Sequence, residues 1–320
     1  MRTRTLIPSL LTLLLVLGLT ACSSSSGGEA SSTTTAAPKE CTGPADAYSK
    51  TVGTADDFVP VTEDTLTVVT SLPGPGFFEG SDDDPTDITS GYEYDIAKKM
   101  QEAFGLEKLV IRNESFDAIV AGQVSDYDVA LSQISITCER AEVVDFSVPY
   151  FESDQGILVR KDAPITTLDQ VKAAQIGVQT GTTALDLLDG IDLEKQPRVY
   201  QQLPDGFTAL EAGQVDAFVV DTAIVLGQAA RSDGRLAVSA QFAQPGGPDQ
   251  YGAIIPKGSA NVGAINAAIT ELKDSGELAT LAREDLTGRP VHARRSRPAP
   301  GGAGLVAGPA TPRTRLGRPR

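Results

Sequence analysis

The sequence predicts an α/β protein made of two similar lobes. From Leu66 to Leu286, short runs of β-branched and aliphatic residues alternate with segments whose apolar residues recur at helical spacing. This alternation is typical of parallel sheets covered by helices. The pattern F-x-A-[I/L]-x-A-G-Q-V also occurs twice, at 116–124 and at 207–215, where a helix is expected to end at glycine and lead into a strand. A repeat in the same structural position predicts a duplicated lobe.

The composition is that of a globular protein with room for two domains in its 320 residues. Hydrophobic residues make up 41% and charged residues 22%. Acidic residues outnumber basic ones, 42 to 27, and the formal charge of −15 argues against a nucleic-acid partner. The single histidine, His292, lies near the C-terminus, so we expect neither a histidine-based catalyst nor a histidine-rich metal site.

The N-terminus has the features of an export signal. Arg2 and Arg4 precede an apolar run, 6–19, that is too short to be a stable membrane span. The run ends in Leu-Thr-Ala-Cys, which resembles the lipobox of bacterial lipoproteins, and Cys22 would then carry the lipid on the outer face of the cell membrane. In the alternative, an ordinary secretory signal is cut nearby and Cys22 is incidental. Residues 1–22 are thus a predicted signal peptide, and the Ser/Thr-rich stretch 23–40 a flexible tether.

Two further cysteines, Cys41 and Cys138, remain. An exported chain tends to pair its cysteines, so we expect a disulfide between them, with two free thiols as the alternative. The disulfide would hold the start of a loosely ordered lead-in segment, 41–64, beside the stretch that contains Cys138.

The first lobe is expected to begin at residue 65 and to run to residue 160. A buried strand at Leu66–Thr70 is followed by a long loop rich in Gly, Pro and Asp. The expected elements after this loop, in order, are a helix with the apolar face Ile96, Met100, Ala103 and Phe104, a strand around Leu109 and Ile111, a helix from Ser115 or Phe116 to Gly122, and a strand through Val129, Leu131 and Gln133.

The stretch 132–150, SQISITCERAEVVDFSVPY, is where the first lobe is expected to bind an anion. Thr137 can cap a short helix that has Arg140 in its first turn, and the hydroxyl of Ser135 lies nearby. Helix N-termini attract anions, and arginine binds a carboxylate through two parallel hydrogen bonds. The alternative is a capped surface helix whose arginine points into water.

The second lobe is expected to be inserted into the first, at 161–247. Its expected elements are strands at 176–179, 199–201 and 217–220 and helices at 168–172, from 180–183 onward, 205–212 and 222–230. The chain would return to the first lobe at 248–288 with two further helices. Two strands, Gly156–Arg160 and Tyr251–Ile255, are expected to cross between the lobes and form a hinge, with a ligand cleft beside it.

The C-terminal tail, 289–320, contains eight arginines and no acidic residue. Such a segment is not expected to fold alone, so it is a predicted disordered basic tail. It would either bind anionic lipid or cell-wall polymer, or be a translation-frame artefact.

Five short sequence motifs follow one another along the chain: GYEYDIA at 91–97, SITCERA at 135–141, VDFSVPY at 144–150, GVQTGTT at 177–183 and AGQVDA at 212–217. In this order they resemble the motifs of a known family, the extracellular solute-binding proteins of ABC importers for polar amino acids (bacterial family 3). The resemblance covers 66–286 and implies the type II periplasmic binding fold, in which the ligand lies between two α/β lobes.

The resemblance also implies roles for matching residues. Arg140 matches the arginine that binds the ligand α-carboxylate, and Ser135 the residue beside it that donates its backbone N–H. Thr182 and Thr183 match the turn of the second lobe that closes on the same carboxylate, and Asp221 the acid that takes the ligand ammonium. A zwitterion that leaves water needs both charges paired at once.

The loop after the first strand departs from the family pattern. An acid and an aromatic are common there, but this chain has Ser71 and Gly74. Tyr92 is expected to supply the aromatic wall instead, and Gln133 completes the predicted ligand-binding set. The Pro-Gly loop is similar to that of glutamate-type binding proteins, so glutamate, glutamine or a related polar amino acid is the expected ligand.

Three functions compete. The first is a lipid-anchored monomeric receptor that delivers an amino acid to an ABC permease and needs no cofactor. The second is an enzyme on the same fold, such as a dehydratase, for which Glu79 and Glu93 are the nearest candidate general acids. The third is a ligand sensor for a signalling partner, which the sequence does not distinguish from the first.

Overall fold

The computed structural model describes residues 41–80, 87–244, 246–286 and, as backbone, 304–307. The predicted signal peptide, Cys22, the tether and most of the basic tail lie outside these residues. Within the described part, no helix combines the length and the apolar character needed to span a membrane.

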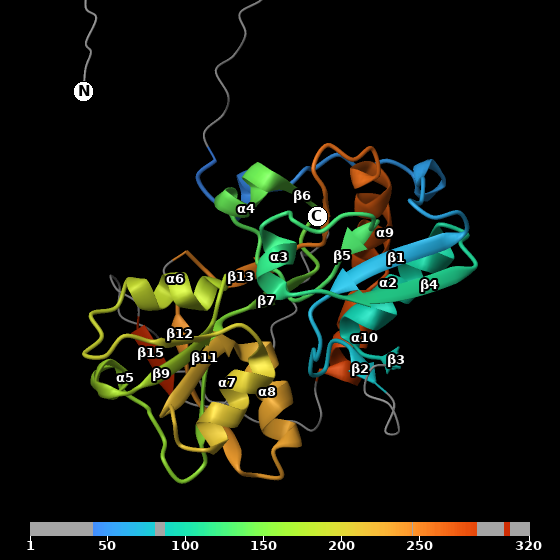
Figure 1. The fold of residues 1–320 in the computed structure, drawn as a ribbon. Helices are drawn as coiled ribbons and strands as arrows, with labels where there is room; N and C mark the ends of the chain where they lie inside the picture. Colours follow the sequence, from blue (N-terminus) through green and yellow to red (C-terminus); the bar gives the residue numbers. More distant parts are fainter. Residues whose placement is uncertain (1–40, 81–86, 245, 287–303, 308–320) are drawn as a thin grey trace, which may run out of the picture. The chain divides into compact units, whose positions relative to one another are not determined.

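The first lobe is built on a five-stranded sheet with the order β4-β1-β5-β14-β6. Figure 1 shows β1 and β4 of this sheet side by side. Strand β1, Thr65–Thr70, is buried along its whole length and runs parallel to its two neighbours. The other strands of this sheet are β4 (Lys108–Asn113), β5 (Val129–Ala130), β14 (Ile254–Pro256) and β6 (Val144–Phe146). Strand β14, which follows the return of the chain from the second lobe, is antiparallel to β5 and β6.

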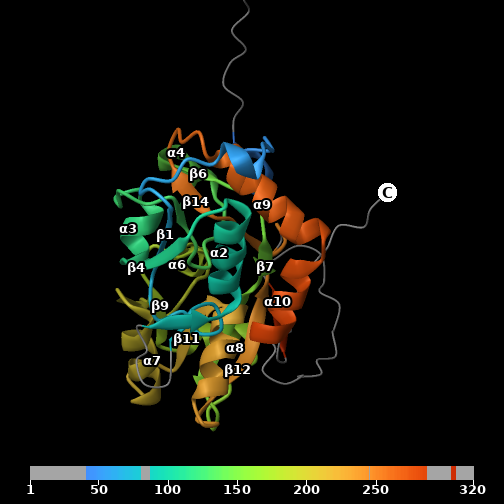
Figure 2. The ribbon, with the colours of Figure 1, turned by 90° about the vertical axis from the view of Figure 1, so that its right-hand side faces the viewer.

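Helices cover both faces of this sheet. On one face, α2 (Tyr92–Ala103), α9 (Val262–Asp274) and α10 (Glu277–Asp285) pack together (Figure 2). The other face carries α3 (Phe116–Val120) and α4 (Cys138–Val143). A small two-stranded sheet, β2 (Glu79–Gly80) with β3 (Ile88–Ser90), precedes α2.

The second lobe is built on a six-stranded sheet with the order β10-β9-β11-β8-β12-β15. Its strands are β8 (Gln155–Arg160), β9 (Ile176–Gln179), β10 (Arg198–Tyr200), β11 (Ala217–Asp221), β12 (Leu236–Ala243) and β15 (Gly304–Ala307). Helices α5 (Leu168–Ala173) and α6 (Thr183–Asp189) pack on one face, and α7 (Leu203–Glu211) and α8 (Thr222–Arg231) on the other.

The predicted duplication is confirmed by the topology. In each lobe three parallel strands are followed in the sheet by an antiparallel fourth, β4-β1-β5-β14 in one lobe and β10-β9-β11-β8 in the other. The two copies of the repeated pattern lie at the ends of α3 and α7. Each ends at a glycine in the left-handed region, Gly122 (φ 66) and Gly213 (φ 71). A side chain with a Cβ rarely adopts this conformation, which explains the repeated glycine.

The predicted crossing strands need correction. The prediction places Gly156–Arg160 between the lobes, but β8 pairs with β11 and β12 inside the second sheet. The segments that pair with each other between the two sheets are β7 (Phe151–Ser153) and β13 (Asp249–Tyr251). The second lobe therefore begins near residue 154. An apolar strand pattern indicates burial but not the sheet in which the strand is buried.

Two other segments are more ordered than the sequence predicts. The lead-in segment contains α1 (Pro44–Ala47) and the 3₁₀ helix η1 (Ala55–Asp57), and the buried Asn266 side chain donates to the carbonyls of Ser49 and Thr51. In the basic tail, β15 adds an antiparallel strand to β12, so this part of the tail is not disordered.

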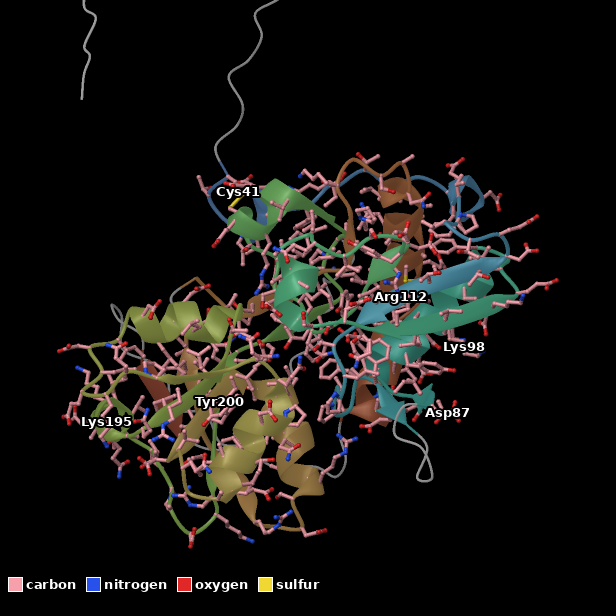
Figure 3. All side chains as sticks on the ribbon, viewed as in Figure 1. Cys41, Asp87, Lys98, Arg112, Lys195 and Tyr200 are labelled. Carbon is pink, nitrogen blue, oxygen red and sulfur yellow. A yellow bond between two sulfur atoms is a disulfide. The ribbon has the colours of Figure 1, made fainter. Side chains whose placement is uncertain are left out.

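Cys41 and Cys138 form a disulfide with Cα atoms 5.7 Å apart (Figure 3). This is the pairing that the sequence favours. It attaches the start of the lead-in segment to the first residue of α4, two residues before Arg140.

Candidate functional site

Arg140 lies between the two lobes. Thr137 caps α4 as predicted: its hydroxyl oxygen accepts a hydrogen bond from the Arg140 backbone N–H. The guanidinium is buried and donates from Nη1 to the Ser135 carbonyl oxygen (2.6 Å) in the first lobe and from Nη2 to the Gly181 carbonyl oxygen (2.8 Å) in the second. The Phe116 ring lies 5.6 Å from the guanidinium carbon, at cation–π distance. Arg140 does not point into water.

The electrostatics around Arg140 are unbalanced. Burial lowers the pKa of Arg140, and the carboxylates of Asp249 and Asp221 act in the opposite direction. Burial raises the pKa of Asp221 well above its usual value, and the charge of Asp249 raises it further, while Arg140 lowers it. Two carboxylates thus share the field of one guanidinium in a region with little solvent.

The turn at the start of α6 faces this region from the second lobe. Thr182, the N-cap residue, donates its hydroxyl to the Gln179 carbonyl oxygen (2.7 Å). The Thr183 hydroxyl donates to Oδ2 of Asp249 (2.7 Å) and lies 3.4 Å from the Ser135 hydroxyl of the first lobe. The residues that the family pattern singles out on opposite lobes are therefore neighbours in space.

Asp221 ends strand β11 at the edge of the same region. It occupies the N-cap position of α8, but its side chain makes no capping hydrogen bond. Its Oδ1 accepts a hydrogen bond from Nε2 of Gln155 (3.1 Å), and the residue is only 5% exposed. The carboxylate is thus held away from the helix and within the space between the lobes.

A narrow cavity of about 20 Å³ lies between the lobes. Both lobes contribute to its wall. The lining residues are Ser71, Phe116, Ser132, Gln133, Gln179, Thr182, Leu203, Val220, Asp221 and Ile224. Four predicted site residues line it, and no cationic side chain is among the described lining residues. This volume holds about one water molecule.

The prediction for Tyr92 is wrong. Tyr92 is fully buried in the first lobe, where its hydroxyl donates to the Tyr150 carbonyl oxygen (3.0 Å) and its ring packs on Phe77 and Phe151. The aromatic residue that lines the cavity is Phe116. Tyr92 follows Gly91 on the inner side of α2, and the helical periodicity that buries Ile96 buries Tyr92 as well.

Gln133 and Ser71 line the cavity from the first lobe. Gln133 has a left-handed backbone (φ 51) and lies beyond the end of β5, which stops at Ala130 rather than continuing to Gln133 as predicted. Its Nε2 and backbone N donate to the two carboxylate oxygens of Glu93, at 2.5 Å and 2.8 Å. The backbone N of Ser71 donates to the Ser132 hydroxyl oxygen (3.0 Å). Both residues line the cavity, and the amide of Gln133 is already used by the protein.

The sequence does not reveal two polar side chains of this region, Gln155 and Asp249. Gln155 begins β8, and Asp249 begins β13 after a Gly-Pro turn. The available signal is that each lies within a few residues of a segment that passes between the lobes. Within the described ranges, no group of three or more His, Cys, Asp or Glu side chains is arranged to hold a metal ion.

Comparisons with known proteins agree with this geometry. The L-cystine-binding protein TcyJ of Escherichia coli (strain K12) is 29% identical over 219 residues, 66% of this chain and 77% of the relative. The glutamine-binding protein GlnH of the Bacillus subtilis (strain 168) ABC transporter is 31% identical over 191 residues, 58% of this chain and 68% of the relative. The crystal structure of a mutant of ArgBP from T. maritima superposes with a TM-score of 0.62 at 29% identity, covering 70% of this chain and 96% of that one.

The family model of the bacterial extracellular solute-binding proteins, family 3, matches residues 77–284. The match includes the repeated pattern, the hinge strands and the residues that surround Arg140. The fold is that of the type II periplasmic amino-acid-binding proteins, with two sheet-containing lobes. The chain belongs to the bacterial extracellular solute-binding proteins, family 3.

Proposed function

We propose that this protein is an extracytoplasmic receptor that binds a polar amino acid between its two lobes, closes on it and delivers it to an ABC permease. In this proposal it acts as a monomer, is tethered to the outer face of the cell membrane by a lipid on Cys22, and is not an enzyme. The relatives from E. coli and B. subtilis, an L-cystine-binding and a glutamine-binding protein, support an amino-acid ligand.

The observation that carries the proposal is the position of Arg140. A buried guanidinium is costly unless it is paired with an anion. Here it donates to one carbonyl oxygen on each lobe, Ser135 and Gly181, and has further N–H groups to offer. An α-carboxylate that enters between the lobes can accept from it, and Asp221, which lines the cavity between the lobes, can accept from the α-ammonium.

The size of the cavity supports a mechanism that includes opening. A volume of about 20 Å³ does not admit an amino acid. The ligand therefore enters only when the lobes separate, and the paired strands β7 and β13 are the connection about which they would turn. A ligand that contacts both lobes at once shifts the population toward the closed form, because it stabilises that form alone.

The lining favours glutamine over glutamate. An acidic side chain that leaves water needs a cationic partner, and no described lining residue supplies one. Hydroxyl and amide groups of Ser71, Ser132 and Gln179 belong to the polar part of the wall, and Phe116 and Leu203 to the apolar part. This mixture fits an uncharged polar side chain with a short aliphatic stem.

The dehydratase alternative has little support from the candidate acids. Glu93 is fully buried and its carboxylate is used by Gln133 and Tyr150, while Glu79 is ion-paired with Arg231. Neither lines the cavity. A sensor for a signalling partner would have the same ligand site as a transport receptor, so the ligand experiment applies to both.

A thermal-shift screen of the full chain against the twenty L-amino acids tests the proposal. A ligand present at about 100 times its Kd stabilises the folded state by about 2.7 kcal/mol. We expect the largest shift for L-glutamine and a smaller one for L-glutamate. The absence of a shift across the whole panel would refute amino-acid binding.

A further inference from the structure

Asp249 is the point at which polar side chains of both lobes meet. Its Oδ2 accepts hydrogen bonds from the Ser135 hydroxyl (3.2 Å) of the first lobe, the Thr183 hydroxyl (2.7 Å) of the second and Nε2 of Gln155 (2.8 Å) at the start of β8. Asp249 itself lies on β13, one of the two strands that pass between the sheets. A single carboxylate thus contacts both walls and the hinge.

Gln155 separates two carboxylates. Its Nε2 donates to Asp249 and also to Oδ1 of Asp221 (3.1 Å), so the side-chain amide stands between the two acids. The surrounding acceptors, which include the Thr183 hydroxyl oxygen (3.1 Å), determine which end of the amide is nitrogen. Asp221 and Asp249 are therefore held close together by a neutral donor.

The other end of the same amide is unsatisfied. Gln155 is fully buried, and its Oε1 has no hydrogen-bond partner within the described part of the chain. An unpaired buried acceptor costs about 1–3 kcal/mol. Such a group, beside two carboxylates, can accept a hydrogen bond from a donor on a bound ligand.

The hydrogen-bond inventory identifies the kind of donor. Each hydroxyl has one proton, and those of Ser135 and Thr183 are directed to Asp249, which leaves their oxygens with lone pairs only. The acidic side chains of Asp249, Asp221, Asp186 and Glu139 act on one buried guanidinium, that of Arg140. Acidic groups therefore outnumber the one basic group of this region. A primary ammonium, with three N–H groups and one positive charge, would donate to these acceptors and offset the excess of carboxylates.

We propose that Asp249 is a second acidic binding residue for the ligand α-ammonium, and that Gln155 is a positioning residue that holds Asp249 and Asp221 around it. The inference rests on the proposed function and deepens it. It assigns the ammonium to a pair of carboxylates, one on the second lobe and one on the hinge, where the family pattern points to Asp221 alone. The chemical consequence is that the protein selects for a free primary amine independently of the ligand side chain.

The test is a calorimetric titration of the full chain with two probes. The probes are the L-amino acid with the largest shift in the twenty-member screen, L-glutamine being expected, and its N-acetyl derivative, which lacks the ammonium. Wild type is expected to prefer the free amino acid by at least about 100-fold. Asp249→Asn is expected to weaken binding of the free amino acid by at least about 30-fold and to leave the N-acetyl derivative within about twofold, because truncating one side of a desolvated charge pair weakens only the ligand that carries the charge.

Two further variants separate binding from a structural role. Asp249→Glu retains the carboxylate and is expected to keep most of the preference for the free amine, even if it folds less stably. Glu152→Gln removes a carboxylate from the neighbouring hinge strand β7, where it accepts from Gln250, and is the matched control with unchanged affinities.

The outcomes distinguish the two proposals. If wild type binds a free amino acid and Asp249→Asn keeps the preference over the N-acetyl derivative, the role of Asp249 is wrong and the proposed function stands. If Asp249→Asn does not fold, Asp249→Glu provides the test. A folded Asp249→Glu that binds the free amino acid but no longer prefers it over the N-acetyl derivative would overturn the role of Asp249. If wild type binds no amino acid, the proposed function itself fails.

Discussion

Arg231, in the last turn of α8 in the second lobe, forms an ion pair with Glu79, on β2 of the first lobe. The same carboxylate oxygen accepts a hydrogen bond from the backbone N–H of Gly76 (2.5 Å). One turn earlier on α8, a Cβ added at Gly227 would lie 2.8 Å from the Pro75 carbonyl oxygen. The lobes therefore meet at a second place, away from Arg140, through an ion pair and a close backbone contact.

Arg231→Gln is expected to weaken amino-acid binding about three- to fivefold at low salt, mainly through faster dissociation. The pair is partly exposed, and such pairs contribute about 0.2–1 kcal/mol. Stopped-flow and calorimetric measurements at low and high salt test this, because screening should bring wild type close to the variant. Arg198→Gln, on β10 of the same lobe, is the control. A double-mutant cycle with Glu79→Gln that shows no coupling would contradict a role for the pair.

Gly227→Ala is expected to lower ligand affinity without destabilising the second lobe. Alanine is favoured over glycine inside a helix by about 1 kcal/mol. The added Cβ, however, meets the Pro75 carbonyl only when the lobes are together. Denaturant unfolding without ligand should show equal or greater stability, and calorimetry weaker binding. Unchanged affinity would mean that the loop before Phe77 moves aside at no cost.

Arg140→Ala is expected to abolish measurable binding while the protein still folds. Removing one partner of a desolvated charge pair costs about 2–5 kcal/mol, a loss of at least about 30-fold in affinity. Arg140→Lys is the matched variant: it keeps the charge but not the planar fork that contacts both Ser135 and Gly181, so we expect an intermediate loss. Wild-type affinity in the alanine variant would remove Arg140 from the site.

The free energy of unfolding is expected to fall as the pH rises from about 4.5 to about 7, through Glu93. Burial raises the pKa of Glu93 from 4.5 to about 7, against the lowering effect of hydrogen bonds from Tyr150 and Gln133. The folded state therefore binds this proton more tightly than the unfolded state. The contribution is complete below about pH 4.5 and is lost as the pH passes about 7, a difference of about 3 kcal/mol.

Glu93→Gln provides the comparison, since glutamine does not titrate. Denaturant unfolding of both proteins between pH 4.5 and pH 8 should show a smaller decline for the variant. Asp221, whose pKa is also raised by burial, contributes in the same direction to both proteins. Parallel curves for wild type and variant would show that Glu93 titrates near its ordinary pKa.

Removing the disulfide with Cys41→Ser and Cys138→Ser together is expected to lower the free energy of unfolding by about 3–5 kcal/mol. The bridge closes a long loop, with a sequence separation of 97, and long loops restrict the unfolded chain most. Amino-acid affinity should change by less than about threefold, since Arg140 is also held by Ser135 and by the Thr137 cap. Equal stability of the double variant and the oxidised wild type would contradict this account.

Much of the fold could be predicted because local sequence patterns determine where its helices and strands lie. The repeated helix–glycine–strand motif depends on a left-handed backbone at Gly122 and Gly213, which is a local requirement. The sheet to which β8 belongs depends on pairing with β11, which lies far away in the sequence. Strand periodicity shows that a segment is buried but not its partner, so the hinge was predicted a few residues away from its position.

The same distinction applies to the site. Arg140, Thr182 and Asp221 follow the ends of strands or begin helices, so their positions can be inferred from the chain order. Asp249 has no such signal, because its importance arises only where β13 brings it against Ser135 and Thr183 from separate elements. Tyr92 shows the converse error: an aromatic residue near a loop was assigned to the cavity, although helical periodicity turns it into the core.

The pairing of Ser153 with Asp249 has one more consequence. The second lobe leaves the first at one of these residues and returns at the other, and antiparallel partners lie only about 5 Å apart. Residues 154–248, which supply every strand of the second sheet except β15, are thus an insert whose two ends are adjacent. Such a segment could be exchanged for the corresponding segment of a relative without rerouting the rest of the first lobe. Ligand specificity that resides in this segment could then be transplanted as a unit.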